Sequence, residues 1–308
     1  MPETASIRAR RSATLIGMAA IPIWAGLALL TSRAARIPPF QLVAMSFFIA
    51  AVVGAGMIVM RGGFRAMPRV DWRALALGVA GLFGNHFFFF LAVRNAPVME
   101  VALINYTWPL LVVLFSALLP ASALGARRLD WRHVSGGLMG MAGAALVVAS
   151  ANSGTAGAHD GGAWLGFAAA LAGAVIWAAY SVASRLFAHV PTQMVALYCL
   201  ITAVLALLAH VLTETTQWPQ DSAEWLAVLL LGLGPVGGAF YFWDHGMKHG
   251  DVRLLGVLCY LIPLLSLLLL SLDAGQWPHA RVWLAAALII GGAVLAARGE
   301  RAGRASAP

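Results

Sequence analysis

The segments Tyr106-Thr107-Trp108-Pro109-Leu110-Leu111 and Tyr260-Leu261-Ile262-Pro263-Leu264-Leu265 share the pattern Tyr-x-x-Pro-Leu-Leu. Three further pairs of segments match in the same order: Ile23-Trp24-Ala25 with Ile176-Trp177-Ala178, Gln41-Leu42-Val43-Ala44 with Gln193-Met194-Val195-Ala196, and the aromatic run from Phe87 to Arg94 with that from Tyr241 to Lys248. One short match would not be significant, but four matches in the same order, at a nearly constant offset of about 153 residues, indicate an internal repeat.

The repeated segments lie in long apolar runs. Of the 308 residues, 61% are hydrophobic and 10% are charged, whereas a soluble domain carries about 25% charged residues. The composition therefore excludes soluble domains. A hydrocarbon core about 30 Å thick requires roughly 20 apolar residues per helix. This length predicts ten membrane-spanning helices: Ala13–Thr31, Phe40–Met60, Ala74–Val93, Val98–Leu119, Val134–Ser150, Ala163–Ser184, Val190–Leu212, Trp225–Met247, Leu254–Leu272 and Val282–Ala297.

Each copy of the repeat contains five of these helices. Because five is odd, the second copy begins on the opposite face of the membrane. The sequence therefore predicts an all-α integral membrane protein whose ten transmembrane helices form two inverted five-helix repeats. We assign residues 1–150 to the first repeat and 163–308 to the second. Residues 151–162, rich in Gly and Ala, are predicted to be an external linker.

The basic residues predict the orientation. Sixteen of the twenty Lys and Arg residues fall in the two tails and in the connections on the side of the N-terminus, against four on the other side, which are Arg33, Arg36, Arg94 and Arg281. Connections rich in Lys and Arg stay in the cytoplasm, so we expect both termini to be cytoplasmic. The net charge of +8 then reflects topology, and we expect the lipid bilayer and no nucleic acid as a partner.

These motifs resemble those of the drug/metabolite transporter superfamily, in its ten-helix EamA-type branch. The resemblance covers essentially the whole chain, and Asn105-Tyr106-Thr107-Trp108-Pro109 is similar to the corresponding segment of bacterial aromatic amino acid exporters. The resemblance implies a bacterial inner (plasma) membrane protein that works by export. It also implies a central cavity, lined by the first, third, fourth, sixth, eighth and ninth helices, that opens to one side at a time.

Four prolines, Pro22, Pro109, Pro235 and Pro263, fall within predicted spans. A proline inside a helix removes a backbone donor and frees a carbonyl about one turn earlier. Transporters of inverted-repeat architecture bind substrate near such breaks at the midplane, so the matched pair Pro109 and Pro263 marks the first place to expect a site. The alternative is that all four are packing kinks, which membrane helices tolerate.

Polar and aromatic side chains in the spans are the candidates for substrate binding. Asn85 and His86 stand in the middle of the third helix, where they must find interior partners; the alternative is an interhelical hydrogen bond. Aromatic rings with polar tips suit a ring-bearing zwitterion, although such stripes are often packing seams. The aromatic candidates are Trp24, Tyr106, Trp108, Trp177, Tyr180 and Tyr260.

Three residues are candidates for a gate or for coupling. Glu100 lies one turn into the fourth helix and is expected near Arg94. Asp244 has Lys248 four residues on, so a local ion pair competes with a coupling role. Trp243, near the inner end of the eighth helix, is a gate candidate or a member of the interfacial belt. We find no catalytic residues, no metal ligands at binding spacing and no motif for a cofactor.

The sequence therefore predicts a secondary-type transporter of small neutral or zwitterionic metabolites. Aromatic and bulky apolar amino acids are the preferred substrates, because the spans contain aromatic and hydroxyl groups and lack a buried cation at the midplane. A broad-specificity drug or metabolite exporter is the alternative, and an intramembrane enzyme is a remote one. Coupling to protons, the direction of transport and the oligomeric state, monomer or homodimer, stay open.

Overall fold

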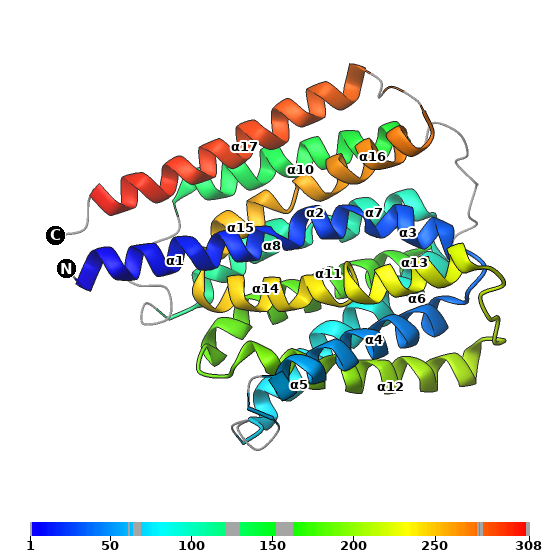
Figure 1. Cartoon of the computed structure of the whole chain (residues 1–308). Coiled ribbons are helices and arrows are strands. Elements are labelled where there is room, and N and C mark those ends of the chain that lie inside the picture. The colour runs from blue at the N-terminus through cyan, green and yellow to red at the C-terminus, as the bar shows by residue number, and fades with distance from the viewer. Residues whose placement is uncertain are drawn as a thin grey trace.

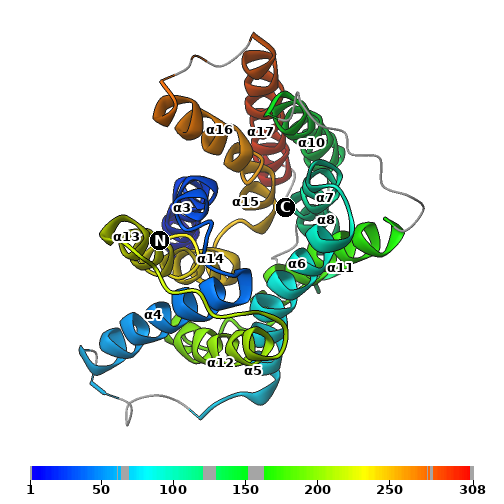
Figure 2. The same cartoon turned by 90° about the vertical axis from the view of Figure 1, so that its right-hand side faces the viewer.

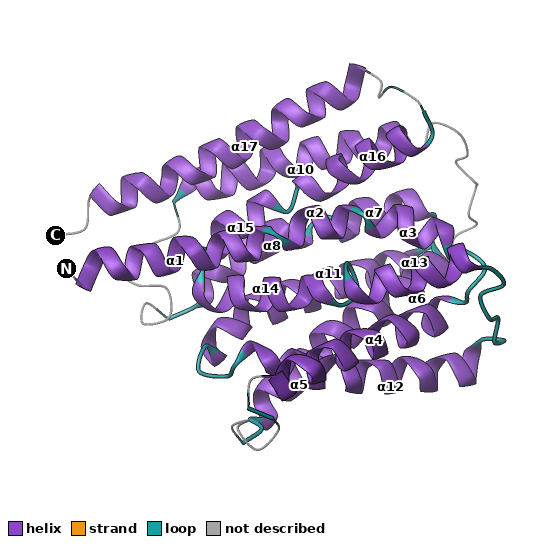
Figure 3. Ribbon diagram, in the orientation of Figure 1, coloured by secondary structure: helices purple, strands orange, loops and turns teal. Residues whose placement is uncertain are grey.

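The structure is a computed structural model that describes residues 2–60, 62–63, 69–120, 130–151, 163–275, 277 and 280–305. Within these ranges every regular element is a helix and no strand occurs (Figure 3). The described residues hold nine segments long and apolar enough to cross a membrane, so the protein is a multi-span membrane protein. These are Ile7–Arg33, Pro39–Met60, Trp72–Asn95, Val98–Leu118, Trp164–Phe187, Thr192–Thr213, Ser222–His249, Val252–Asp273 and Ala280–Arg298.

Four of the nine segments are interrupted close to a proline. A proline ring clashes with the carbonyl four residues earlier, which places each interruption at the proline or up to one turn before it. Helices end before Pro22, Pro109 and Pro263 in this way, and Pro235 lies inside a non-helical stretch, 234–237. The helices that make up these four segments are α1 (Pro2–Met18), α2 (Ala20–Ala25), α3 (Leu27–Arg33), α7 (Val98–Asn105), α8 (Trp108–Phe115), η3 (Ser116–Leu118), α13 (Ser222–Leu233), α14 (Gly238–His249), α15 (Val252–Leu258) and α16 (Leu261–Asp273).

The third segment departs from regular α-helix without a proline. A π-helical turn, η2 (Ala80–Gly84), joins α5 (Trp72–Val79) to α6 (Asn85–Asn95). The other elements are α4 (Pro39–Met60), α10 (Trp131–Ala151), α11 (Trp164–Ala183) with the 3₁₀ turn η4 (Ser184–Phe187), η5 (Thr192–Met194) leading into α12 (Val195–Thr213), and α17 (Ala280–Ala305).

The predicted fifth span, Val134–Ser150, lies within α10, which is not among the nine segments. This helix runs along α17 (Figure 1). A Cβ atom added to Gly136 would lie 2.5 Å from the Gly292 carbonyl oxygen, so glycines permit the close approach of the two backbones. The predicted linker falls on residues 151–162, of which only Ala151 is described, at the end of α10.

The helices run along a common direction (Figure 1). The start of α1 and the end of α17 lie at the same end of the molecule, which we call the termini end, and the other is the opposite end. Seen from the opposite end, α10, α16 and α17 form one side of the molecule and α4, α5 and α12 the other (Figure 2). Between them lie α2, α8, α11 and α14, whose buried side chains share the largest hydrophobic core.

Candidate functional site

Four tryptophans from four different segments meet in the core. Trp24 of α2, Trp108 of α8, Trp177 of α11 and Trp243 of α14 lie with all six pairs of ring centroids 5.1–6.5 Å apart. Their exposed fractions are between 1% and 8%. We call this cluster the tryptophan tetrad. It unites three of the predicted substrate-binding residues with Trp243, which the sequence placed at a gate or in the interfacial belt.

Two indole N–H groups of the tetrad are satisfied by the protein. Trp24 Nε1 donates to the carbonyl oxygen of Pro235 at 3.0 Å, an acceptor in the interrupted stretch between α13 and α14. Trp243 Nε1 donates to Ser181 Oγ at 3.0 Å. Within the described residues, Trp108 and Trp177 have no such acceptor. Their N–H groups are therefore the donors that this cluster can offer to a ligand.

The aromatic cluster continues from the tetrad to the third segment. Phe240 contacts the rings of Trp24 and Trp177, with centroids 6.0 and 5.6 Å away. Phe47 of α4 stacks on Phe240 at 5.5 Å, and the His86 ring meets Phe47 edge-on at 5.2 Å. His86 is thus joined to the tetrad through Phe240 and Phe47, two residues that the sequence analysis did not select.

The π-helical turn positions His86. A π turn leaves backbone carbonyls without their usual helical donors, and His86 Nδ1 donates to the carbonyl oxygen of Leu82 at 2.8 Å. Because Nδ1 carries the proton, Nε2 is left as an acceptor. Asn85, the first residue of α6, is half-buried, and its side chain makes no hydrogen bond within the described residues.

The three remaining aromatic residues predicted to bind substrate lie in three different environments. Tyr180 of α11 is buried, contacts the Trp177 ring at 5.4 Å, and has a hydroxyl without a hydrogen-bond partner in the described part of the chain. Tyr106 is half-buried in the interruption between α7 and α8. Tyr260 is fully buried in a separate core cluster beside Ile289 of α17, because the missing side chain of Gly140 leaves room for its ring. It therefore lies outside the tetrad.

Glu100, which the sequence predicts to lie near Arg94, forms no ion pair with it within the described residues. Glu100 lies in the first turn of α7, half-buried, and its Oε2 has no hydrogen-bond partner within the described residues. Arg94, at the end of α6, instead forms an ion pair with Glu214 at 3.0 Å. The Arg94 side chain therefore contacts the end of α12.

Glu214 is a buried carboxylate that joins three segments at the opposite end. It accepts hydrogen bonds from the backbone N–H groups of Phe40 and Gln41 at the start of α4, at 3.1–3.2 Å. It also accepts from Arg94 and lies 2.9 Å from His210 Nδ1. We call these residues the opposite-end cluster. A carboxylate at a helix N-terminus is favoured by the helix dipole and by the free N–H groups.

Replacing Glu214 by glutamine is expected to lower the free energy of unfolding by about 2 kcal/mol, because charge-assisted hydrogen bonds to buried groups are lost. Thermal unfolding of the detergent-solubilised protein measures the change. The matched control is Asp273→Asn, which removes the exposed ion pair with Arg33 and is expected to cost less than about 0.5 kcal/mol. Equal losses in the two variants would show that the opposite-end cluster contributes no more than a surface pair.

A different polar cluster lies at the termini end. Asp244 and Lys248 of α14 form an ion pair at 2.9 Å with both side chains almost fully buried. Thr192 Oγ1 donates to Asp244 at 2.8 Å, and Lys248 donates to the Val190 carbonyl oxygen at 3.0 Å. These four residues, which we call the termini-end cluster, tie α14 to the connection between α11 and α12.

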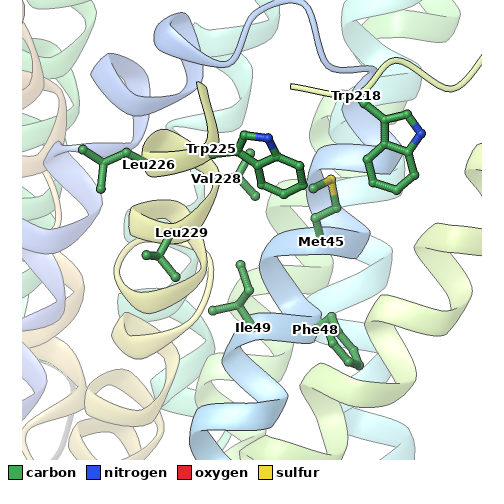
Figure 4. A pocket seen from close by; sticks show the side chains of 8 residues that line it. All are labelled: Met45, Phe48, Ile49, Trp218, Trp225, Leu226, Val228 and Leu229. Atoms are coloured by element: carbon green, nitrogen blue, oxygen red, sulfur yellow. The ribbon is translucent and has the colours of Figure 1, made fainter. Parts of the chain in front are cut away.

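The apolar pockets on the outside of the molecule are separate from this core. One, with a volume of about 630 Å³, lies between α4 and α13 (Figure 4). Its lining residues include Phe48, Trp218 and Leu226, all exposed on the outer surface. Among the described residues no group of three or more His, Cys, Asp or Glu side chains is arranged to hold a metal ion.

Comparisons with known proteins agree over nearly the whole chain. Residues 11–149 and residues 164–298 each match the EamA-like transporter family. The aromatic amino acid exporter YddG of Ancylobacter novellus is 50% identical over 93% of this chain and 97% of its own length. The protein of the same name from Salmonella typhimurium is 25% identical over 92% and 96%. A solved crystal structure, 49% identical, superposes with a TM-score of 0.86 over 93% of this chain and 98% of its own.

Proposed function

Because the chain belongs to the EamA-like transporter family, we propose that it exports aromatic amino acids through a central path that passes the tryptophan tetrad. The proposal rests chiefly on the tetrad itself, four indoles in mutual contact from four segments, three of which are interrupted close to a proline. The exporters of aromatic amino acids to which the chain is similar support this choice of substrate. Their bacterial sources support placement in the inner membrane.

The proposed topology has ten spans in two inverted repeats, with α10 as the fifth span and both termini in the cytoplasm. Two features support it. The family match occurs twice, at 11–149 and 164–298, close to the two sequence repeats. The start of α1 and the end of α17 lie at the same end of the molecule (Figure 1), as an even number of spans requires. The termini end is then the cytoplasmic end.

Binding would exchange one ring contact for another. Aromatic pairs contribute about 0.5–1.5 kcal/mol each beyond the area they bury, so a substrate ring that replaces an indole–indole contact in the tetrad restores most of that interaction. The free N–H groups of Trp108 and Trp177 are placed to donate to the substrate carboxylate. His86 Nε2, Asn85, Tyr106 and the Tyr180 hydroxyl are the further polar groups available to the ammonium and carboxylate. Tyr260 is left out, because it packs against α10.

Counterflow in proteoliposomes tests this function. Vesicles loaded with unlabelled phenylalanine are diluted into labelled phenylalanine or tryptophan, with tetraphenylphosphonium as a competing hydrophobic cation. We expect saturable exchange of both amino acids and little inhibition by the cation. Absence of exchange with every aromatic amino acid would refute the proposal, and strong inhibition of the exchange by the cation would favour a broad-specificity drug exporter.

The His86→Ala variant is expected to lower phenylalanine exchange about tenfold, because it removes an aromatic contact and a hydrogen-bond acceptor together worth about 1.5 kcal/mol. The measurement is the initial rate of counterflow, normalised to the amount of reconstituted protein. His189→Ala is the control, because His189 is exposed and its ion-pair partner is Asp71, at 3.5 Å. Equal rates for the two variants would make His86 a packing residue.

A further inference from the structure

The termini-end cluster contains a buried carboxylate oxygen to which no described residue donates a hydrogen bond. Asp244 follows Trp243 directly in α14, so it lies next to the tetrad. Its Oδ2 accepts from Thr192 and Lys248, whereas Oδ1 is buried and has no hydrogen-bond partner within the described residues. An unpaired buried carboxylate oxygen is costly and calls for an unseen ligand.

A small cavity adjoins Asp244. Its volume is about 10 Å³, and its polar lining comes from Tyr180 and Ser184 of α11 and its extension, Tyr198 of α12, and Asp244 and Lys248 of α14. Ala74 and Leu77 of α5 close it with apolar side chains. The Tyr180 hydroxyl is a second buried group that has no hydrogen-bond partner among the described residues. A cavity of this size holds about one water molecule.

The surroundings favour a proton over a metal ion as the bound cation. The Lys248 ammonium already occupies the position beside the carboxylate at 2.9 Å, so a second cation would meet a like charge at short range. A metal ion would also require more oxygen ligands than a cavity for one water supplies. The titratable groups facing Asp244 are Lys248, Tyr180 and Tyr198, with His245 adjacent on α14.

The sequence repeat provides a comparison at the opposite end. Arg94 and Lys248 occupy matching positions in the two repeats, as do Gln41 and Gln193, the neighbour of Thr192. At the opposite end, Glu214 joins Arg94, at the end of the third helix of the first repeat, to the start of the second helix, α4. At the termini end, Asp244 joins Lys248, at the end of the third helix of the second repeat, to Thr192, at the start of the second helix. The two differ in that Glu214 has both oxygens bonded, whereas Asp244 keeps one free.

We propose that Asp244 is the proton-binding site of the transporter and that its protonation weakens the attachment of α14 at the termini end. The proton adds to Oδ1, with water in the adjoining cavity as its carrier, and the carboxylate becomes a neutral acid. Lys248 keeps its own proton and its bond to Val190, but its attraction to Asp244 is lost. Thr192 then donates to a neutral acid instead of a carboxylate, so the tie between α14 and the connection between α11 and α12 is weakened. This inference rests on the proposed function, which it extends by naming the coupling ion.

The experiment compares two activities of the full-length protein in proteoliposomes. One is phenylalanine counterflow, and the other is phenylalanine accumulation driven by an imposed proton gradient. The quantity compared is the ratio of the second to the first, so that a general loss of activity cancels. We expect gradient-driven accumulation in the wild type and a ratio at least tenfold lower in Asp244→Asn. The control, Glu224→Gln, removes an ion pair with Arg36 at the opposite end and is expected to keep the wild-type ratio.

If the Asp244→Asn protein does not insert in the membrane because Lys248 has lost its carboxylate partner, a double variant takes its place in the test. This variant, Asp244→Asn/Lys248→Gln, removes both charges. Wild-type counterflow without any effect of the gradient would overturn the proton site and leave the proposed function intact. Absence of counterflow would instead overturn the proposed function. In that case tryptophan fluorescence against pH decides the proton site: a pH-dependent change lost in the Asp244 variant supports it, and identical curves refute it.

Discussion

Replacing Trp177 by alanine is expected to reduce the affinity for aromatic amino acids at least tenfold. Trp177 contacts every other member of the tetrad as well as Phe240, so its loss removes more than one ring contact available to a substrate. At about 0.5–1.5 kcal/mol for each aromatic contact, two contacts correspond to roughly a 5–150-fold change in affinity. Counterflow measured over a range of phenylalanine concentrations gives the change.

The matched control lies on the same helix. Trp164 begins α11 and is 69% exposed, which is typical of the aromatic belt at a membrane interface. We expect Trp164→Ala to transport normally. Trp177→Phe is expected to recover part of the affinity, because it keeps a ring but loses the indole N–H that we propose donates to the substrate carboxylate. Equal impairment of Trp177→Ala and Trp164→Ala would show that a general defect, and not the tetrad, lowers transport.

Replacing Gly237 by alanine is expected to have the largest effect on folding. Gly237 lies in the interruption between α13 and α14, where an added Cβ would collide with the Gly232 carbonyl oxygen and approach the Ala50 Cβ to 2.7 Å. Backbone cannot move aside as a side chain can, so we expect a loss of about 3 kcal/mol in the free energy of unfolding. Thermal unfolding and the amount of protein inserted in the membrane measure the loss.

Gly56 offers the control for this variant. It lies on α4, where an added Cβ would meet no atom within 4 Å. Alanine has a higher helix propensity than glycine by about 1 kcal/mol, so Gly56→Ala is expected to leave stability unchanged or to raise it. A Gly237→Ala protein as stable as Gly56→Ala would show that the interruption between α13 and α14 relaxes more easily than its contacts indicate.

The membrane character of the chain could be predicted from sequence because it depends on local properties. Apolar runs of about 20 residues predict spans without knowledge of any contact. Proline acts within one turn of its own position, so the interruptions near Pro109 and Pro263 follow from the sequence alone. The internal sequence matches paired Trp24 with Trp177, and the structure places the centroids of their rings 5.9 Å apart.

The remaining features of the site depend on contacts between distant segments. Phe240 and Glu214 are ordinary residues in the sequence, and their importance appears only when α14 reaches the tetrad and α12 meets the start of α4. The π-helical turn before His86 has no proline to signal it. Tyr260 matches Tyr106 in the repeat, but Gly140 on a neighbouring helix decides its packing. No rule of spacing within one segment predicts such contacts.

Binding of labelled phenylalanine to the purified full-length protein is the most direct test of the central claim, that the tryptophan tetrad holds the aromatic substrate. A scintillation proximity assay on the wild type, Trp108→Ala, Trp177→Ala and Trp164→Ala compares the four proteins without any need for transport. We predict saturable binding to the wild type and to Trp164→Ala, and at least tenfold weaker binding to both tetrad variants. Undiminished binding to Trp108→Ala and Trp177→Ala would contradict the claim.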